Sequence, residues 1–246
     1  MPRVREVLAR RDAVAQLAVV VGAFAAYEVA RHAMEPNWAQ AFANARRIES
    51  VEQVLGLAWE QSLQRAFLAL PDLMQALNVF YFVGHFVFTG IFFVWLYRRS
   101  WSGFRSFRDA FLIATAISVV VHWLFPTAPP RLVAGVGLED TLLVFSGIDI
   151  GSPDSAAFSN PVAAVPSLHA AYALGVGVGV IRYARSHLVR FAGAIYPPLV
   201  VLTIVVTGNH FVLDAVAGIA VIGAGFLVVR WWRGRNRERS SRVCAA

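Results

Sequence analysis

The chain has no lysine, one cysteine and few charged residues of either sign. The single cysteine, Cys244, has no second cysteine to pair with, which excludes a disulfide within the chain. Charged residues make up 15% of the 246 residues, and hydrophobic residues make up 58%. Average soluble proteins are about 25% charged and about 45–50% apolar, so the composition excludes an ordinary soluble domain. Together with a mean hydropathy of +0.58, it indicates an integral membrane protein.

Positive charge is supplied by arginine alone, and the formal net charge is +7. A basic balance can indicate binding to nucleic acid or to an anionic membrane surface. Here the arginines form short blocks between apolar runs, and few aromatic residues lie among them. We therefore interpret them as determinants of membrane topology and expect no nucleic-acid partner.

Six apolar stretches are long enough, or nearly long enough, to cross the hydrocarbon core of a bilayer, which takes roughly 17–25 helical residues. They predict an all-α fold: a polytopic membrane helical bundle of six transmembrane helices in a single domain over residues 1–246. The expected spans are 13–30, 76–97, 109–125, 168–182, 193–208 and 210–230.

The arginine blocks orient these spans. They precede the first span, separate the second from the third and the fourth from the fifth, and follow the sixth, so all four fall on one side. The positive-inside rule makes that side cytoplasmic. We therefore expect a multi-pass protein of the cell membrane with both termini in the cytoplasm. The loops 31–75 and 126–167 then face outward.

Three segments outside the central spans carry separate expectations. Residues 45–70 place apolar side chains at three-to-four spacing, which predicts an interfacial amphipathic helix on the outer leaflet, or alternatively a lid over a lipid-binding site. Residues 231–246 are basic and predict a disordered cytoplasmic tail. The first apolar run follows basic residues, as in a signal peptide, but its length favours a retained span. The arginine-only, alanine-rich composition is consistent with a bacterial protein.

Two short polar motifs interrupt the apolar sequence, AVPSLHAAYA at 164–173 and TGNHFVLDAVAG at 207–218. They place His169, His210 and Asp214 at membrane depth, where an ionisable group commonly costs about 2.5–3.5 kcal/mol and is a functional-site candidate. On the expected topology both motifs lie at the outer membrane face. His210 and Asp214 share one helix face, so the carboxylate can hold the imidazole in one tautomer and expose Nε2 as a nucleophile or base.

The same membrane face carries residues suited to an anion. The segment PSLH reads as a helix start, where free N–H groups favour negative charge, and Ser167 adds a hydroxyl group. Arg131, in FPTAPPRL, can clamp phosphate oxygens through its guanidinium group. Two histidines with an anion site favour phosphoryl transfer over acyl transfer. His122 and His85 are further candidates for a substrate or network role.

With these residues in place, the sequence resembles the type 2 phosphatidic acid phosphatase superfamily. The matching residues are PSLH at 166–169 and NHFVLD at 209–214, and the six-span pattern extends the resemblance over most of the chain. The TAPPR and PSLHAAYA forms resemble the inositol phosphorylceramide synthase-like branch. The resemblance implies that His210 forms a phosphohistidine, Asp214 orients it and His169 protonates the leaving group. It also implies that no metal or other cofactor is needed.

The chain departs from the family's phosphatase pattern at three points. The lysine of the usual first motif is absent, and the resemblance assigns phosphate binding to Arg131, which corresponds loosely to that motif. Ile204 stands where an arginine is expected six residues before the nucleophile. Leu168 replaces the glycine of Pro-Ser-Gly-His.

The sequence therefore predicts an integral membrane lipid phosphatase or phosphotransferase, acting on a lipid phosphate, diphosphate or phosphodiester at the outer membrane face. A transferase similar to inositol phosphorylceramide synthase, with a lipid or polyol acceptor, is one alternative. A six-span transporter or a lipid-binding protein is another, although no duplicated half-sequence is visible. A catalytic zinc site built from the two histidines and the aspartate, and a purely structural role in joining helices, are further alternatives.

Overall fold

The computed structural model describes residues 2–33, 37–149 and 160–243, and it is helical there apart from loops and one isolated β-bridge. The chain divides into two compact units, residues 1–35 and 36–246, which are described separately. The first unit consists of helix α1 (Pro2–His32). The second unit carries both polar motifs.

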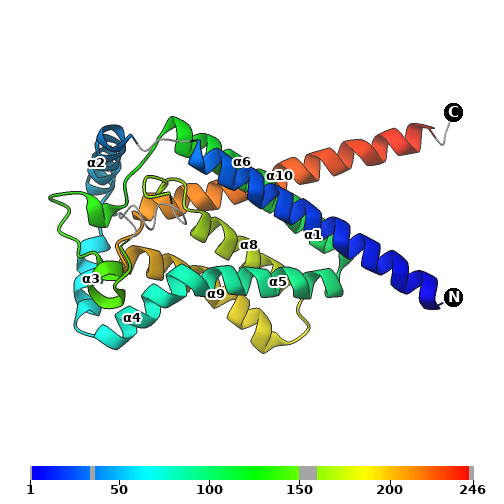
Figure 1. Cartoon of the computed structure of the whole chain (residues 1–246), viewed down its shortest axis with the longest axis horizontal. Helices are drawn as coiled ribbons and strands as arrows, with labels where there is room; N and C mark the ends of the chain where they lie inside the picture. Colours follow the sequence, from blue (N-terminus) through cyan, green and yellow to red (C-terminus); the bar gives the residue numbers. More distant parts are fainter. Residues whose placement is uncertain (1, 34–36, 150–159, 244–246) are drawn as a thin grey trace. The chain divides into compact units, whose positions relative to one another are not determined.

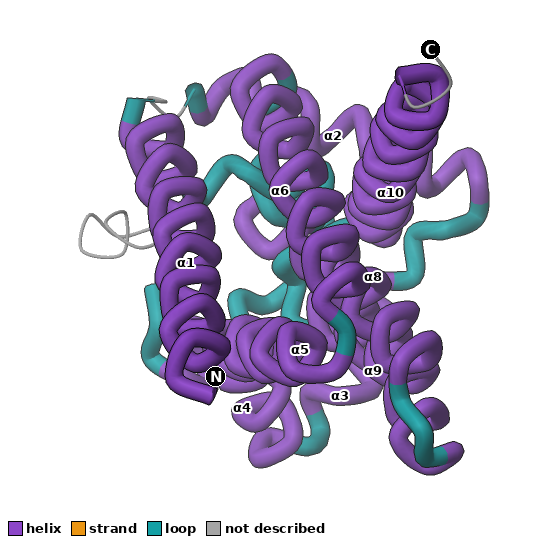
Figure 2. Tube along the Cα trace, turned by 90° about the vertical axis from the view of Figure 1, so that its right-hand side faces the viewer, coloured by secondary structure: helices purple, strands orange, loops and turns teal. Residues whose placement is uncertain are grey.

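The second unit is an assembly of helices joined by short connections and one long loop region between α6 and α8 (Figures 1 and 2). In chain order its helices are α2 (Trp38–Leu55), α3 (Glu60–Leu68), α4 (Pro71–Val79), the π-helical turn η1 (Phe80–Gly84), α5 (His85–Arg99), α6 (Trp101–Leu124), the 3₁₀ turn η2 (Pro130–Leu132), α7 (Thr141–Ser146), α8 (Leu168–Tyr183), α9 (His187–Val206) and α10 (Val212–Val243). The turn η1 joins α4 and α5 into one continuous helix from Pro71 to Arg99.

Polar side chains define where several of these helices begin. Asn37, Ser100, Asp140 and Ser167 each accept a main-chain N–H from the first turn of the following helix. Such capping satisfies amides that have no partner inside the helix. These four residues therefore fix the starts of α2, α6, α7 and α8.

Five of the six expected spans are confirmed as helices long and apolar enough to cross a bilayer. They are Asp12–His32, Pro71–Arg99, Trp101–Leu124, His187–Val206 and Val212–Asn236. The fourth expected span forms α8, whose 16 residues reach about 24 Å at about 1.5 Å per residue. The hydrocarbon core is about 30 Å thick, so α8 alone falls short of it and a sixth span is not shown.

Helix α8 is the central helix of the second unit. It contacts α5, α6, α9 and α10, and its buried residues are alanine, glycine and valine. Such small residues let helix backbones approach closely, and a Cβ atom at Gly177 would lie 2.6 Å from the carbonyl oxygen of Gly193 on α9. Because protein surrounds α8, it can begin partway along its longer neighbours. Its first turn reaches His85, near the middle of the continuous helix 71–99.

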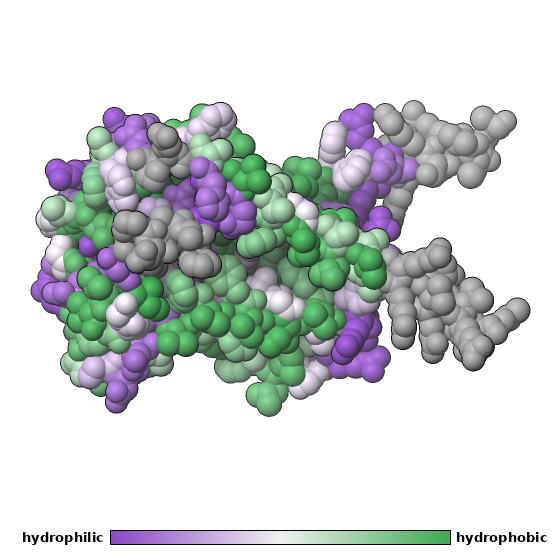
Figure 3. Space-filling view, in the orientation of Figure 1, coloured by the Kyte–Doolittle hydropathy of each residue, from purple (hydrophilic) through white to green (hydrophobic). Residues whose placement is uncertain are grey.

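The exposed surface of the bundle is apolar along its sides. Figure 3 shows hydrophobic side chains along α5, whereas hydrophilic side chains gather at the end formed by α2 and α3. Phe86, Val87 and Ile91 of α5 are all more than half exposed. Large apolar side chains are stable in such positions when lipid covers them, which agrees with a membrane-spanning α5.

Segment 45–70 forms two helices in place of the expected single one. Gly56 adopts a left-handed backbone conformation with φ of 68°, which ends α2 before α3 begins. Within this segment the carboxyl groups of Glu52 and Glu60 are buried, while the apolar side chain of Leu55 is exposed. Of the expected apolar face, Ile48 packs into the protein and Leu55 is exposed, whereas the buried carboxyl groups come from residues outside that face.

The basic tail also differs from the expectation. Helix α10 continues through residues 231–243, where disorder was expected. Arginine and glutamate have high helix propensity, and Gly234 is the single helix-weakening glycine in that stretch. Residues 244–246, with Cys244, lie outside the described residues.

The close approach of α10 to the start of α8 gives a stability test. A Cβ atom at Gly218 would lie 2.1 Å from the carbonyl oxygen of Ser167. Gly218→Ala therefore has to separate the two helices, and we expect the free energy of unfolding to fall by about 1–3 kcal/mol. The measurement is thermal denaturation in detergent. Gly223→Ala, at a position with open space on the same helix, is the matched control. Equal stability of both variants would contradict the close contact.

Candidate functional site

The candidate site lies where one helix ends and two others begin. Helix α6 ends near His122, α8 carries His169 in its first turn, and His210 lies two residues before the start of α10. Nε2 of His122 is 3.3 Å from the Pro166 carbonyl oxygen, and the ring centroids of His169 and His210 are 5.8 Å apart. The structure thus brings together three histidines from three separate parts of the chain.

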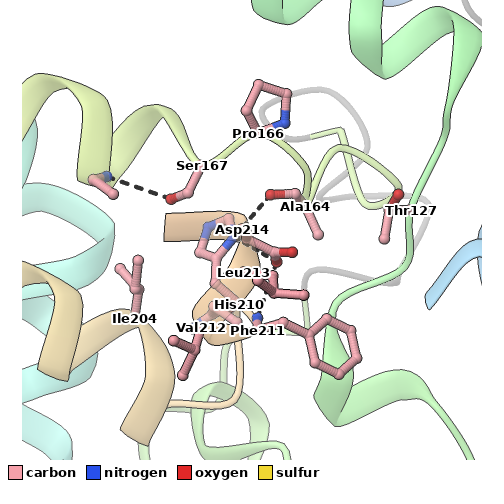
Figure 4. A network of polar contacts seen from close by, with 12 residues as sticks. Thr127, Ala164, Pro166, Ser167, Ile204, His210, Phe211, Val212, Leu213 and Asp214 are labelled. Atoms are coloured by element: carbon pink, nitrogen blue, oxygen red, sulfur yellow. Dashed lines mark hydrogen bonds and ion pairs between the residues drawn. The ribbon is translucent and has the colours of Figure 1, made fainter. Parts of the chain in front are cut away.

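His210 is held in one tautomer by two hydrogen-bond acceptors (Figure 4). Its Nδ1 atom lies 3.0 Å from the carbonyl oxygen of Ala164 and 3.3 Å from Oδ2 of Asp214. Because both partners accept, Nδ1 carries the proton and Nε2 carries the lone pair. The predicted spacing of His210 and Asp214 therefore produces a direct contact.

The protonation state of His210 follows from its surroundings. Burial lowers the pKa of His210 to about 3, the hydrogen bond to Ala164 partly opposes that decrease, and the charge of Arg131 adds to it. The imidazole is therefore neutral at physiological pH, since its usual pKa is about 6.5. A neutral imidazole is the form that can act as a nucleophile or a base.

Asp214 connects the start of α10 to the start of α8. Its Oδ2 atom accepts the main-chain amide of Phe211 at 2.9 Å, in addition to the contact with His210. Its main-chain carbonyl oxygen accepts the amide of Ser167 at 3.0 Å. The first turns of the two helices are therefore hydrogen-bonded to each other, which fixes His169 relative to His210.

Two glutamates from outside the motifs bind the next amides of α10. Oε1 of Glu52 accepts the Leu213 amide at 2.6 Å, and Oε1 of Glu60 accepts the Val212 amide at 3.0 Å. The first amides of a helix have no partner within it and carry partial positive charge, so carboxyl oxygens stabilise them. Helices α2 and α3 are thereby fastened to the turn that follows His210.

His169 lies in a cluster of aromatic rings. It stacks on Tyr81 with a centroid distance of 4.5 Å and an interplanar angle of 20°, and the His85 ring centroid is 4.8 Å away. Tyr81 belongs to the π-helical turn η1, and His85 directly follows that turn. Single π-helical turns occur frequently at functional sites. The turn η1 and the residue after it thus place both Tyr81 and His85 next to His169.

Arg131 is buried beside the loop that carries His210. Its Nε atom is 3.2 Å from Oδ2 of Asp140, and its Nη1 atom donates to Oδ1 of Asn209. Its main-chain amide donates to the Gly208 carbonyl oxygen at 3.0 Å. Both the backbone and the guanidinium group of Arg131 are thus held against the residues preceding His210.

Ser167 and Ile204 take part in the local hydrogen bonding. Oγ of Ser167 accepts the Ala170 amide at 3.4 Å, so the hydroxyl oxygen is used as a cap while its hydrogen can still be donated. The carbonyl oxygen of Ile204 accepts the amides of Asn209 and His210 at 3.0 and 3.1 Å. Both bonds are made by the main chain of Ile204. They therefore hold the loop before His210 although the arginine of the family pattern is absent at this position.

Three residues that contact this group were not predicted as site residues: Tyr81, Glu52 and Glu60. Tyr81 precedes His85 by four residues, a spacing that places two side chains on one helix face and that could have linked them. Nothing in the sequence identifies the two glutamates, because the amides they bind lie 152 and 161 residues away.

Comparison with known proteins gives one finding. A family model described as the PAP2 superfamily matches residues 46–228, about three quarters of the chain. The matched region contains both polar motifs and every predicted site residue. No curated protein and no solved structure matches the chain. Within the described residues, no three histidine, cysteine, aspartate or glutamate side chains are arranged to hold a metal ion.

Glu52 provides a pH test of the contacts at the start of α10. Burial, followed by a hydrogen bond with Glu60, raises the pKa of Glu52 from its usual value of 4.5 to about 9. Between these two values the folded state keeps a proton that the unfolded state releases. The stabilisation is therefore complete below pH 4.5 and is lost as the pH rises through about 9. Glu52→Gln cannot ionise, so we expect thermal midpoints that decline less steeply over this pH range.

The control for this prediction is Glu49→Gln, which alters a carboxyl group one turn earlier on α2. Glu49 accepts a hydrogen bond from Gln53 and does not contact α10 amides. Its midpoints should follow those of the unaltered protein at every pH. If Glu52→Gln also followed them, the buried protonated carboxyl group would be contradicted.

Proposed function

Because the chain belongs to the PAP2 superfamily, we propose that it is an integral membrane phosphoryl-transfer enzyme with His210 as its nucleophile. Its substrate is a lipid phosphate, diphosphate or phosphodiester. The observation that carries this proposal is the environment of His210, in which Nδ1 faces two acceptors and Nε2 keeps its lone pair. Such a nitrogen can form a phosphohistidine without a metal ion.

The proposed first step transfers the phosphoryl group to the enzyme. Nε2 of His210 attacks phosphorus, a P–N bond forms, and the bond from phosphorus to the leaving oxygen breaks. Asp214 stabilises the positive charge that develops on the imidazole. His169 gives a proton to the leaving oxygen.

The proposed second step releases the phosphoryl group. A hydroxyl group attacks the phosphohistidine, His169 takes its proton, and the P–N bond breaks. When the hydroxyl belongs to water the enzyme is a phosphatase, and when it belongs to a lipid or polyol the enzyme is a phosphotransferase.

The charge around Arg131 favours the transferase alternative, similar to inositol phosphorylceramide synthase. Arg131 binds the phosphoryl oxygens together with the hydroxyl of Ser167, but its guanidinium group is already 3.2 Å from the Asp140 carboxylate. Ile204 supplies no charge where the family pattern has an arginine. A partly neutralised guanidinium matches the single negative charge of a phosphodiester better than the two charges of a phosphate monoester.

We also propose that α8 acts as a sixth span. The loops that precede it then occupy the part of the membrane thickness that α8 does not reach. This gives the topology indicated by the arginine blocks, with both termini cytoplasmic and the site opening to the outer side. Segment 45–70 then lies at the outer membrane interface, above the start of α10. The apolar exposed side chains of Val51, Leu55 and Trp59 support that position.

His210→Ala tests the proposed nucleophile. We expect it to abolish turnover, a loss of at least about 10⁴-fold, because both steps pass through the bond to Nε2. The measurement is product analysis by mass spectrometry in detergent with excess chelator. The pooled substrates are phospholipids, polyprenyl diphosphates and hydroxyl acceptors. His187→Gln, an exposed histidine at the start of α9, is the control and should retain full activity.

The products separate the alternatives. Free phosphate or a trimmed diphosphate identifies a hydrolase, and a new phosphodiester lipid identifies a transferase. Full activity in His210→Ala contradicts the nucleophile. The absence of any product from the unaltered protein would favour a transporter or a lipid-binding protein.

A further inference from the structure

A cavity of about 330 Å³ lies between the end of α5, the start of α9 and the connection from α8 to α9. The residues that line it are Trp95, Arg99, Ala184, Arg185, Ser186 and Val189. Figure 1 shows the end of α5 and the start of α9 at the end of the second unit that lies away from α2 and α3. The volume falls in the range of small-molecule sites, about 300–1,000 Å³.

The cavity is separate from the candidate functional site. His169 lies in the first turn of α8, whereas Ala184 directly follows its last turn. The 15 residues between them correspond to about 22 Å along the helix at about 1.5 Å per residue. A ligand in the cavity is therefore a second ligand, bound at the other end of α8.

Two arginines give the cavity its charge. Within the part of the chain that the structure describes, neither Arg99 nor Arg185 takes part in an ion pair, and no acidic residue lines the cavity. Nε of Arg99 donates to the main-chain carbonyl oxygen of Tyr183 at 3.0 Å, which holds this side chain against the end of α8. A guanidinium group binds phosphate oxygens through parallel hydrogen bonds, so two of them suit a phosphate group.

The start of α9 adds donors beside these arginines. Ser186 precedes the helix and lines the cavity, and its side chain caps none of the amides within the described residues. Val189 in the first turn also lines the cavity. The first amides of a helix have no partner inside it and carry partial positive charge, which supports an anion held by the two arginines.

Apolar side chains continue from the cavity along α5. Trp95 lines the cavity, and Ile91 and Phe88 follow it at spacings of four and three residues, which places all three on one face of the helix. Ile91 and Phe88 are 59% and 49% exposed. A phosphate site that adjoins exposed apolar side chains fits a phospholipid better than a soluble phosphate, because the acyl chains can cover that surface.

We propose that this cavity binds the head group of an anionic phospholipid from the cytoplasmic leaflet. Basic pockets between transmembrane helices on that side of a membrane bind anionic head groups. The leaflet follows from the proposed topology, in which the arginine blocks are cytoplasmic. The site itself does not depend on the proposed reaction. A zwitterionic head group fits it less well, since no carboxylate is present to pair with its cationic amine.

The test is a titration of the purified full-length protein in uncharged detergent with phosphatidylglycerol, followed by native mass spectrometry. Arg99→Gln combined with Arg185→Gln should weaken binding about tenfold or more, because both charge-assisted contacts are lost. Arg98→Gln combined with Arg190→Gln is the matched control. It removes the same charge from exposed arginines of the same two helices that do not line the cavity, and it should weaken binding less than about threefold.

A second variant tests the cavity without changing charge. Val189→Trp fills it with a larger side chain and should also weaken binding of phosphatidylglycerol about tenfold or more. Leu188→Trp, at the neighbouring position that is 77% exposed and does not line the cavity, should bind as the unaltered protein does. This pair keeps the proposal testable if the double arginine variant does not fold.

Three outcomes would overturn the proposal. Equal weakening by the two arginine pairs would assign the binding to surface charge alone. Equal affinity for phosphatidylglycerol and phosphatidylcholine would exclude an anion site. Binding of inorganic phosphate that Arg99→Gln combined with Arg185→Gln abolishes, with unchanged affinity for phosphatidylglycerol, would identify a site for a soluble anion instead. Because binding is measured and not turnover, none of these outcomes bears on the proposed reaction.

Discussion

The amides at the first turn of α10 are the constraint on which the site depends. They cannot be satisfied within their own helix, and leaving one buried without a partner costs about 1–3 kcal/mol. The chain satisfies three successive amides with carboxyl groups from Asp214, Glu60 and Glu52. One of these carboxyl groups also binds Nδ1 of His210. The fold therefore positions the imidazole of His210 and completes the helix start with the same interactions.

Helix α8 brings the first motif, residues 164–173, to the same depth. Its small residues allow α9 and α10 to pack closely around it, and its short length lets its first turn lie inside the bundle. The amide of Ser167 then reaches the carbonyl oxygen of Asp214. Proximity of His169 and His210 thus follows from backbone contacts and does not depend on a bound ligand. Preorganisation of this kind would lower the reorganisation needed during the proposed reaction.

Much of this arrangement could be predicted from the sequence. Hydropathy predicts six spans, of which five are confirmed, and the spacing of His210 and Asp214 predicts their contact, because both properties are local. Convergence of Arg131, His169 and His210 also follows, since charge patterning orients whole segments. The positions of Glu52 and Glu60 could not be predicted, because their partners are main-chain amides far along the chain. For Glu52, the periodicity of its segment marks an apolar face for the membrane and gives no sign that the carboxyl group is buried. Tyr81 carries no motif, and its contact with His169 depends on the π-helical turn.

The bonds from Glu52 and Glu60 end on main-chain amides and not on side chains. Every residue type except proline supplies such an amide. The hydrogen bonds that attach α2 and α3 therefore do not require particular side chains at positions 212 and 213. Exchange at these two positions for any residue but proline leaves these hydrogen bonds intact, whereas exchange of Glu52 or Glu60 for a side chain without an acceptor oxygen removes them. The turn thus restricts positions 52 and 60 through its hydrogen bonds, and positions 212 and 213 only through the packing of their side chains on the core.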